Sequence, residues 1–139
     1  CLYNEGYIYG VGRAFGIVLN SQEYKLNYLL GILCSKLYHF LMKKECPIKK
    51  GGFFKISSDY LNNLPIKKIS LDQQKRISKL TEKMLNLKEH LITIKDKQTD
   101  SKAQLEKEIQ KLDNEIDEEV YKLYGITEEE KKIIEESLK

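Results

Sequence analysis

The chain has 139 residues, with 24 basic and 21 acidic side chains and a formal net charge of +3. This length suits one domain with a modest core and a helical extension. No apolar run approaches membrane-spanning length and no secretory signal is visible, so we expect a cytoplasmic protein without a membrane segment. The three cysteines and two histidines show no metal-ligand spacing, and the first residue is Cys1 rather than Met. We therefore expect a piece of a larger protein, without a metal site.

The small net charge hides a polarity along the chain. Residues 1–35 are neutral, residues 36–111 hold eighteen basic and nine acidic side chains, and residues 112–139 hold four basic and ten acidic ones. A polyanion is therefore attracted to the middle of the chain and repelled by its end. The plainer interpretation is that lysine-rich helices simply stay soluble, and this interpretation is strong after residue 70.

Residues 1–19 predict a β-hairpin, because aromatic and β-branched residues alternate there with glycines and other residues. Two strands are not stable alone in water, so this hairpin is expected to complete a larger sheet. Arg13 is the only basic residue in it. A lone arginine on a strand is usually a surface or ion-pair residue, and the alternative is a contact with a base edge or a phosphate.

A core-facing helix is predicted over residues 24–44, where large apolar side chains recur at spacings of three and four. Ser21 is its predicted cap, and Pro47 stops it. Lys43 and Lys44 fall in its last turn, where basic side chains suit the negative end of the helix dipole.

The loop that follows, residues 49–66, is the most distinctive stretch of the chain. Gly51 and Gly52 stand side by side, so the backbone has access to conformations closed to other residues. The lysines that flank this pair are Lys49, Lys50 and Lys55. A basic loop with a glycine hinge suits contact with phosphate groups, although an ordinary solvated surface loop would have a similar sequence.

Two apolar seams predict an antiparallel helical hairpin after residue 70. The first seam follows a capping box at Ser70–Gln73 and the second follows one at Ser101–Gln104, with a short polar turn between them. Gly125 ends the second helix, and a third capping box at Thr127 begins a short last helix. The seam residues are Ile77, Leu80, Met84, Leu87, Leu91, Ile94, Leu105, Ile109, Leu112 and Ile116.

These elements predict an α+β, mostly helical fold in two parts, residues 1–69 and residues 70–139. No nucleotide-binding loop, dinucleotide fingerprint, zinc-protease motif or nucleophile elbow occurs in the sequence. The acidic run over residues 113–119 points in several directions on one helix, which favours a solvated face over a metal or acid–base cluster. We therefore expect this chain to be non-catalytic and to hold no cofactor.

Four segments together resemble a known family. They are LLGILCSKLYHF at residues 29–40, KGGFFKI at 50–56, YLNNLPI at 60–66 and IDEEVYKLYGITEEE at 116–130. In this order they resemble the TaqI-like C-terminal specificity domain of type IIG restriction–modification enzymes, which is akin to the target-recognition halves of type I specificity subunits. The resemblance runs from about residue 24 to the end of the chain and is loose over the first twenty residues. Cys34 stands where the family usually has Asn.

The resemblance implies a sequence-specific DNA recognition module at the C-terminal end of a combined restriction endonuclease and adenine-specific DNA methyltransferase. The parent enzyme would use S-adenosylmethionine and Mg²⁺ in parts that lie upstream. Residues 1–69 would then be the end of the target-recognition domain, and residues 70–139 a helical spacer that docks on the methyltransferase domain. The glycine-lysine loop would face the DNA.

Two functional hypotheses follow. In the first, the chain contacts double-stranded DNA, and basic side chains position it on the phosphates. The residues proposed for these contacts are Arg13, Lys43, Lys44, Lys49, Lys50 and Lys55. In the second, the helical hairpin is a protein-interaction module that docks on a partner or forms a homodimer, and the lysines only keep it soluble.

Overall fold

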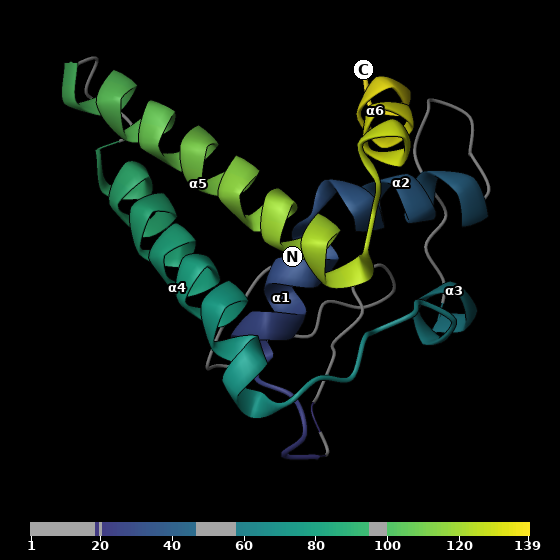
Figure 1. Cartoon of the computed structure of the whole chain (residues 1–139). Helices are drawn as coiled ribbons and strands as arrows, with labels where there is room; N and C mark the ends of the chain where they lie inside the picture. Colours follow the sequence, from purple (N-terminus) through teal and green to yellow (C-terminus); the bar gives the residue numbers. More distant parts are fainter. Residues whose placement is uncertain (1–18, 20, 47–57, 95–99) are drawn as a thin grey trace.

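The computed structural model describes residues 19, 21–46, 58–94 and 100–139 (Figure 1). Six helices account for most of this part of the chain. They are α1 (Leu26–Cys34), α2 (Lys36–Glu45), α3 (Ser58–Asn62), α4 (Leu71–Thr93), α5 (Asp100–Tyr124) and α6 (Glu128–Ser137).

The predicted α+β class is wrong for the described residues, which contain six helices and no strand. The hairpin predicted over residues 1–19 falls outside the described residues except for Leu19, which is not in a strand. A two-stranded hairpin needs further strands to pair with. The described segments offer none, because their apolar residues repeat with helical spacing and pack helix against helix.

The helix predicted over residues 24–44 is two helices that meet at Ser35. The backbone of Ser35 is extended, with φ −71° and ψ 158°, so the helix cannot run through it. Its hydroxyl donates to the Ile32 carbonyl at 2.7 Å and accepts from the Tyr38 N–H at 3.5 Å. One side chain therefore closes α1 and caps α2. The predicted cap Ser21 is not the N-cap of α1, which is Lys25.

The two long helices α4 and α5 run antiparallel and diverge along their length (Figure 1). The capping box predicted at Ser70 is present, with Ser70 and Gln73 each bonding the backbone of the other. Ser101 lies inside α5, so the second capping box is not formed. Gly125 has φ 72° and ends α5, and the Ile126 N–H then donates to the Tyr121 carbonyl at 2.9 Å, as in a Schellman motif.

Helix α1 packs between the diverging ends of α4 and α5 (Figure 1), and Gly31 of α1 lies against α4. A Cβ atom at Gly31 would lie 2.4 Å from Thr81 Oγ1 and 2.8 Å from Ile77 Cγ2. The backbone of α1 therefore comes so near α4 that a side chain at residue 31 would have to displace Thr81 or Ile77.

The core joins both predicted parts of the chain. Its buried members come from α1 and α2 on one side and from α4, α5 and α6 on the other. They are Tyr28, Ile32, Leu37, Tyr38, Ile77, Met84, Leu112, Ile116, Val120, Tyr121 and Ile134. Residues before and after residue 69 thus bury their apolar side chains against each other.

Candidate nucleic-acid interface

The residues predicted to contact DNA divide into two groups. Lys43 and Lys44 are described by the structure. The others lie outside the described residues, as does the glycine pair: Arg13, Lys49, Lys50, Gly51, Gly52 and Lys55.

Lys43 and Lys44 lie exposed in the last turn of α2. Lys43 Nζ donates to the carbonyl of Ser137 at the end of α6. Lys44 Nζ lies 5.5 Å from the centre of the Phe40 ring. Such exposed contacts are weak, so both ammonium groups remain available to an anion at modest cost.

The segment that connects α3 to α4, residues 63–70, is held in place by a cluster of tyrosines. The hydroxyls of Tyr38 and Tyr124 both donate to the Pro65 carbonyl, from Tyr124 at 2.8 Å. Tyr124 also accepts from the Lys67 N–H at 3.0 Å, and the Tyr28 hydroxyl donates to the Lys67 carbonyl at 2.7 Å. Three side chains from α1, α2 and α5 thus fix the path along which the chain returns from the loop region to the helical hairpin.

Burial raises the pKa of two of these tyrosines. It raises the pKa of Tyr28 and of Tyr38 well above the ordinary value, and the neighbouring Tyr124 raises both further. The hydroxyls of Tyr28 and Tyr38 therefore stay hydrogen-bond donors at physiological pH.

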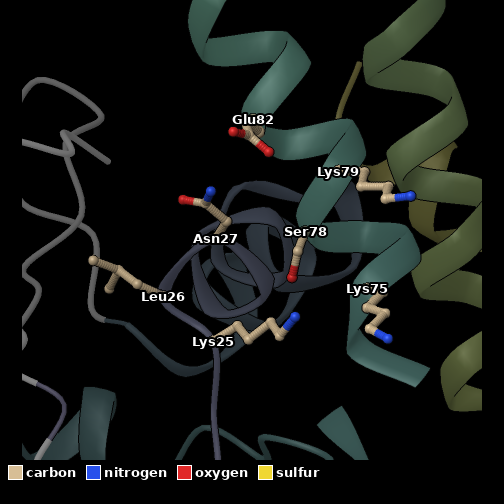
Figure 2. A pocket seen from close by; sticks show the side chains of 7 residues that line it. All are labelled: Lys25, Leu26, Asn27, Lys75, Ser78, Lys79 and Glu82. Atoms are coloured by element: carbon tan, nitrogen blue, oxygen red, sulfur yellow. The ribbon is translucent and has the colours of Figure 1, made fainter. Parts of the chain in front are cut away.

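A second set of polar contacts between distant segments is made by Gln74, which is fully buried on α4. Its Oε1 accepts from the Lys25 N–H at 2.7 Å. Its Nε2 donates to the carbonyls of Glu23 at 2.8 Å and Ile69 at 3.0 Å. The side chain so fixes the start of α1 on α4, beside a groove that lies between these two helices (Figure 2).

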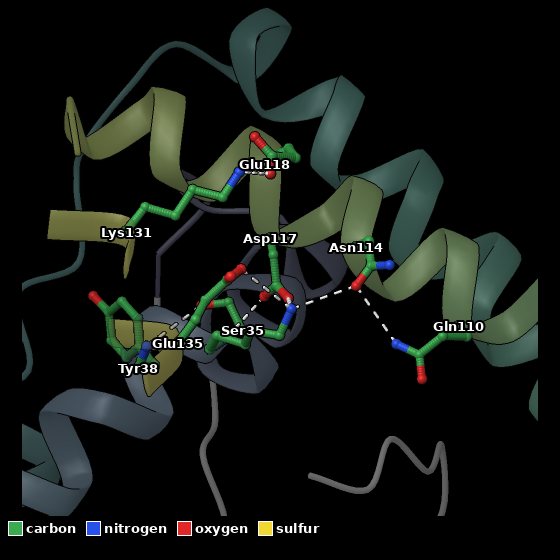
Figure 3. A network of polar contacts seen from close by, with 9 residues as sticks. Ser35, Tyr38, Gln110, Asn114, Asp117, Glu118, Lys131 and Glu135 are labelled. Atoms are coloured by element: carbon green, nitrogen blue, oxygen red, sulfur yellow. Dashed lines mark hydrogen bonds and ion pairs between the residues drawn. The ribbon is translucent and has the colours of Figure 1, made fainter. Parts of the chain in front are cut away.

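A third set of polar contacts joins α2 to α5 through Asp117 (Figure 3). One carboxylate oxygen accepts from the Lys36 N–H at 2.8 Å, and the other lies 3.0 Å from Lys36 Nζ. The same ammonium lies 3.4 Å from Asn114 Oδ1 and 3.7 Å from Glu135. Because Lys36 is the first residue of α2, Asp117 satisfies a free N–H group of that helix and places a negative charge at its positive end.

Burial raises the pKa of the Asp117 carboxyl above its ordinary value, against the opposing effect of the Lys36 N–H and ammonium. The hydrogen bond and charge of Asp117 raise the pKa of Lys36 despite the opposing effect of its partial burial. Lys36 therefore stays charged at neutral pH. The pair therefore joins the start of α2 to α5.

The structure buries half of the predicted seam residues and leaves the others partly exposed. Ile77, Met84, Leu105, Leu112 and Ile116 are buried, whereas Leu80, Leu87, Leu91, Ile94 and Ile109 are half-buried. Two ion pairs cross between the helices, Arg76 to Glu119 at 2.8 Å and Lys83 to Glu108 at 3.0 Å. As the position on α4 rises, the partner on α5 falls, which is the register of an antiparallel pair.

The described residues contain neither a metal site nor a membrane-spanning helix. No group of three His, Cys, Asp or Glu side chains there has a geometry that would hold a metal ion. No helix in the same part of the chain is long and apolar enough to cross a membrane.

Sequence reasoning missed Gln74, Asp117 and Lys25. A glutamine and an aspartate inside charged helices look like solvated surface residues, and nothing in the spacing marks their distant partners. The one available signal was the position of Gln74, which falls three residues before Ile77 on the apolar face of α4.

A comparison with family models gives one match, the TaqI-like C-terminal specificity domain over residues 1–66. It confirms the resemblance of the three segments up to residue 66 and also covers the first twenty residues. It ends at Ile66, so the segment at residues 116–130 lies beyond it. No match was found among curated proteins or among solved structures.

Proposed function

With residues 1–66 matched to a TaqI-like C-terminal specificity domain, we propose that this chain recognises the DNA target of a restriction–modification enzyme. The match is the observation that carries the proposal. The charge distribution supports it, because the positive middle of the chain overlaps the end of the matched region and continues beyond it.

In this proposal the basic side chains near the loop hold the phosphate backbone, and the glycine pair gives the loop its shape. The phosphate contacts are Arg13, Lys43, Lys44, Lys49, Lys50 and Lys55. Phosphate contacts position a protein without reading sequence, so the bases are read by other residues of the matched region or by parts upstream. Two sets of polar contacts support this assignment, because they order the chain on both sides of the loop. Gln74 and Asp117 bind the backbone before the loop, at residues 23–36, and the tyrosine cluster binds the backbone at residues 65–67.

The parent protein, in this proposal, is a combined restriction endonuclease and adenine-specific DNA methyltransferase. S-adenosylmethionine and Mg²⁺ would bind in its upstream domains, and the helical hairpin would dock on the methyltransferase domain. The hairpin suits that role because its far end extends beyond the other helices (Figure 1), where Ile92 is 72 % exposed.

The test is binding of the 139-residue chain to duplex DNA over a range of salt concentrations. Each neutralised phosphate contributes a slope of roughly 0.9 to the dependence of log K on log salt, so Lys49, Lys50 and Lys55 together contribute roughly 2 to 3. The triple alanine variant of these lysines is expected to lose that part of the slope. A matched variant of three exposed helical lysines, Lys88, Lys107 and Lys132, is expected to retain it.

Two results would redirect the proposal. Equal losses in both triple variants would mean that DNA responds only to net charge. Absence of binding at low salt would favour the alternative, a helical interaction module without DNA contact. Analytical sedimentation would then show whether the chain associates with itself.

A further inference from the structure

A groove lies on the surface between the first turn of α1 and the first half of α4, and it has a volume of about 500 Å³ (Figure 2). It is outside the loop region discussed above. Its lining residues are Lys25, Leu26, Asn27, Lys75, Ser78, Lys79 and Glu82. Figure 2 shows Lys25 and Ser78 pointing toward one another across the groove, with Asn27 beyond them and Lys75 and Lys79 along the α4 border.

The first turn of α1 supplies backbone donors at this groove. Its N-cap, Lys25, makes no side-chain cap bond, and the first turn contains no acidic residue. The Lys25 N–H is satisfied by Gln74, whereas the next three N–H groups, up to Tyr28, have no partner within the helix. The positive end of α1 is therefore not compensated by its own sequence, and such helix ends attract anions.

The hydroxyl of Ser78 is a second, independent observation, because it is buried without a hydrogen-bond acceptor among the described residues. The residue is 8 % exposed, and its hydroxyl has no hydrogen-bond partner in the part of the chain that the structure describes. The nearby Thr81 hydroxyl, in contrast, donates to the Ile77 carbonyl at 2.9 Å. A buried hydroxyl without a partner is unfavourable, and an acceptor atom entering the groove would satisfy it.

The charges at the groove select an anion. Lys25, Lys75 and Lys79 outnumber the single acidic residue, Glu82, which lies at one end (Figure 2). Lys75 is paired with Asp72 at 2.6 Å, and the charge of Lys25 also acts on Asp72, although neither Lys25 nor Lys79 has an ion pair within 4 Å among the described residues. Figure 2 shows the ammonium groups of Lys75 and Lys79 directed away from α1, so the donors that face the groove are the Lys25 ammonium, the Ser78 hydroxyl and the first-turn N–H groups of α1. Such a set suits the several acceptor oxygens of a phosphate group.

We infer that the groove between α1 and α4 binds a phosphate group of the DNA backbone. Lys25 supplies the charge, while Ser78 and the first-turn N–H groups of α1 donate hydrogen bonds. This inference rests on the proposed function, because it takes duplex DNA as the source of the phosphate. It adds a contact on the helical side of the protein, made by residues that carry no motif.

The test compares three variants of the 139-residue chain in duplex-DNA binding over a salt range. Lys25→Gln is expected to reduce the slope of log K against log salt by about 1. Ser78→Ala is expected to weaken binding about three- to tenfold without changing the slope, since it removes a neutral hydrogen bond. Lys88→Gln, an exposed lysine further along α4, is the control and is expected to bind as the original chain does.

Thermal unfolding separates binding from folding. Ser78→Ala removes a hydroxyl that the described fold leaves unpaired, so its melting temperature is expected to equal or exceed that of the original chain. A lower melting temperature would show that the hydroxyl has a structural partner and would overturn its assignment to the groove.

A second titration, with inorganic phosphate and two-dimensional amide NMR, distinguishes the sources of the phosphate. Shifts at the first-turn amides of α1 that require about three- to tenfold more phosphate in Ser78→Ala support the site. If the original chain binds DNA but Lys25→Gln and Ser78→Ala bind equally well, the groove assignment is wrong and the proposed function stands. If the original chain does not bind DNA, the proposed function fails, and phosphate shifts then identify a site for the free ion. If those shifts are absent as well, the groove binds no phosphate.

Discussion

Replacing Gly31 by alanine tests the packing of α1 on α4. The added Cβ would lie 2.4 Å from Thr81 Oγ1 and 2.8 Å from Ile77 Cγ2, closer than atoms in proteins normally come. Thr81 is buried and its hydroxyl is bonded to the Ile77 carbonyl, so neither neighbour is free to turn away. Overpacking of this kind costs about 1–3 kcal/mol, and the better helix propensity of alanine returns about 1 kcal/mol. We expect Gly31→Ala to lower the free energy of unfolding by about 1–2 kcal/mol, using the upper part of that range because both contacts are so short.

Urea unfolding followed by circular dichroism measures this change. Cys34→Ala, at an exposed position of the same helix, is the matched control and is expected to change the stability by less than about 0.5 kcal/mol. Combining Gly31→Ala with Thr81→Ala removes the shorter contact, so the double variant is expected to lose less than the sum of the two single changes. If Gly31→Ala is as stable as the original chain, the close approach of α1 to α4 is incorrect.

Two further changes probe the polar contacts. Tyr124→Phe leaves the Lys67 N–H without its acceptor and is expected to cost about 1–2 kcal/mol in urea unfolding, whereas Tyr24→Phe, whose hydroxyl has no bond among the described residues, is expected to cost almost nothing. In the last capping box, the N–H and hydroxyl of Thr127 lower the pKa of Glu130 below its ordinary value. Stability from this pairing is therefore present above pH 4.5 and is lost as the pH falls through the lowered pKa, so Glu130→Gln is expected to flatten this part of the pH dependence of the melting temperature. Parallel curves for Glu130→Gln and the original chain would contradict the assignment.

Much of the helical architecture follows from local sequence. The boxes at Ser70 and Thr127 and the glycine at residue 125 form within a few residues, so the spacing alone predicts them. The break at Ser35 was missed, because the apolar pattern continues across it and only the paired bonds of its hydroxyl reveal it.

The polar contacts of Gln74 and Asp117 depend on partners far away in the sequence. Gln74 meets Lys25 and Asp117 meets Lys36 only after the helices have packed, so neither contact leaves a mark on local spacing. The groove cannot be predicted from local spacing either, because it forms only where the N-terminus of α1 packs beside Ser78 of α4. The basic loop was recognised from composition and from the family resemblance, and its residues lie outside the described part of the chain.

The shared core also has a consequence for where the chain can be divided. The family match ends at residue 66, yet Tyr28, Ile32 and Tyr38 are buried against side chains that lie beyond it. A recombination joint at the end of the matched region would therefore separate core partners and leave both halves with exposed apolar faces. A transfer of the matched segment into another protein would therefore need the helices up to Ser137 with it, so the unit that folds is longer than the unit of sequence similarity.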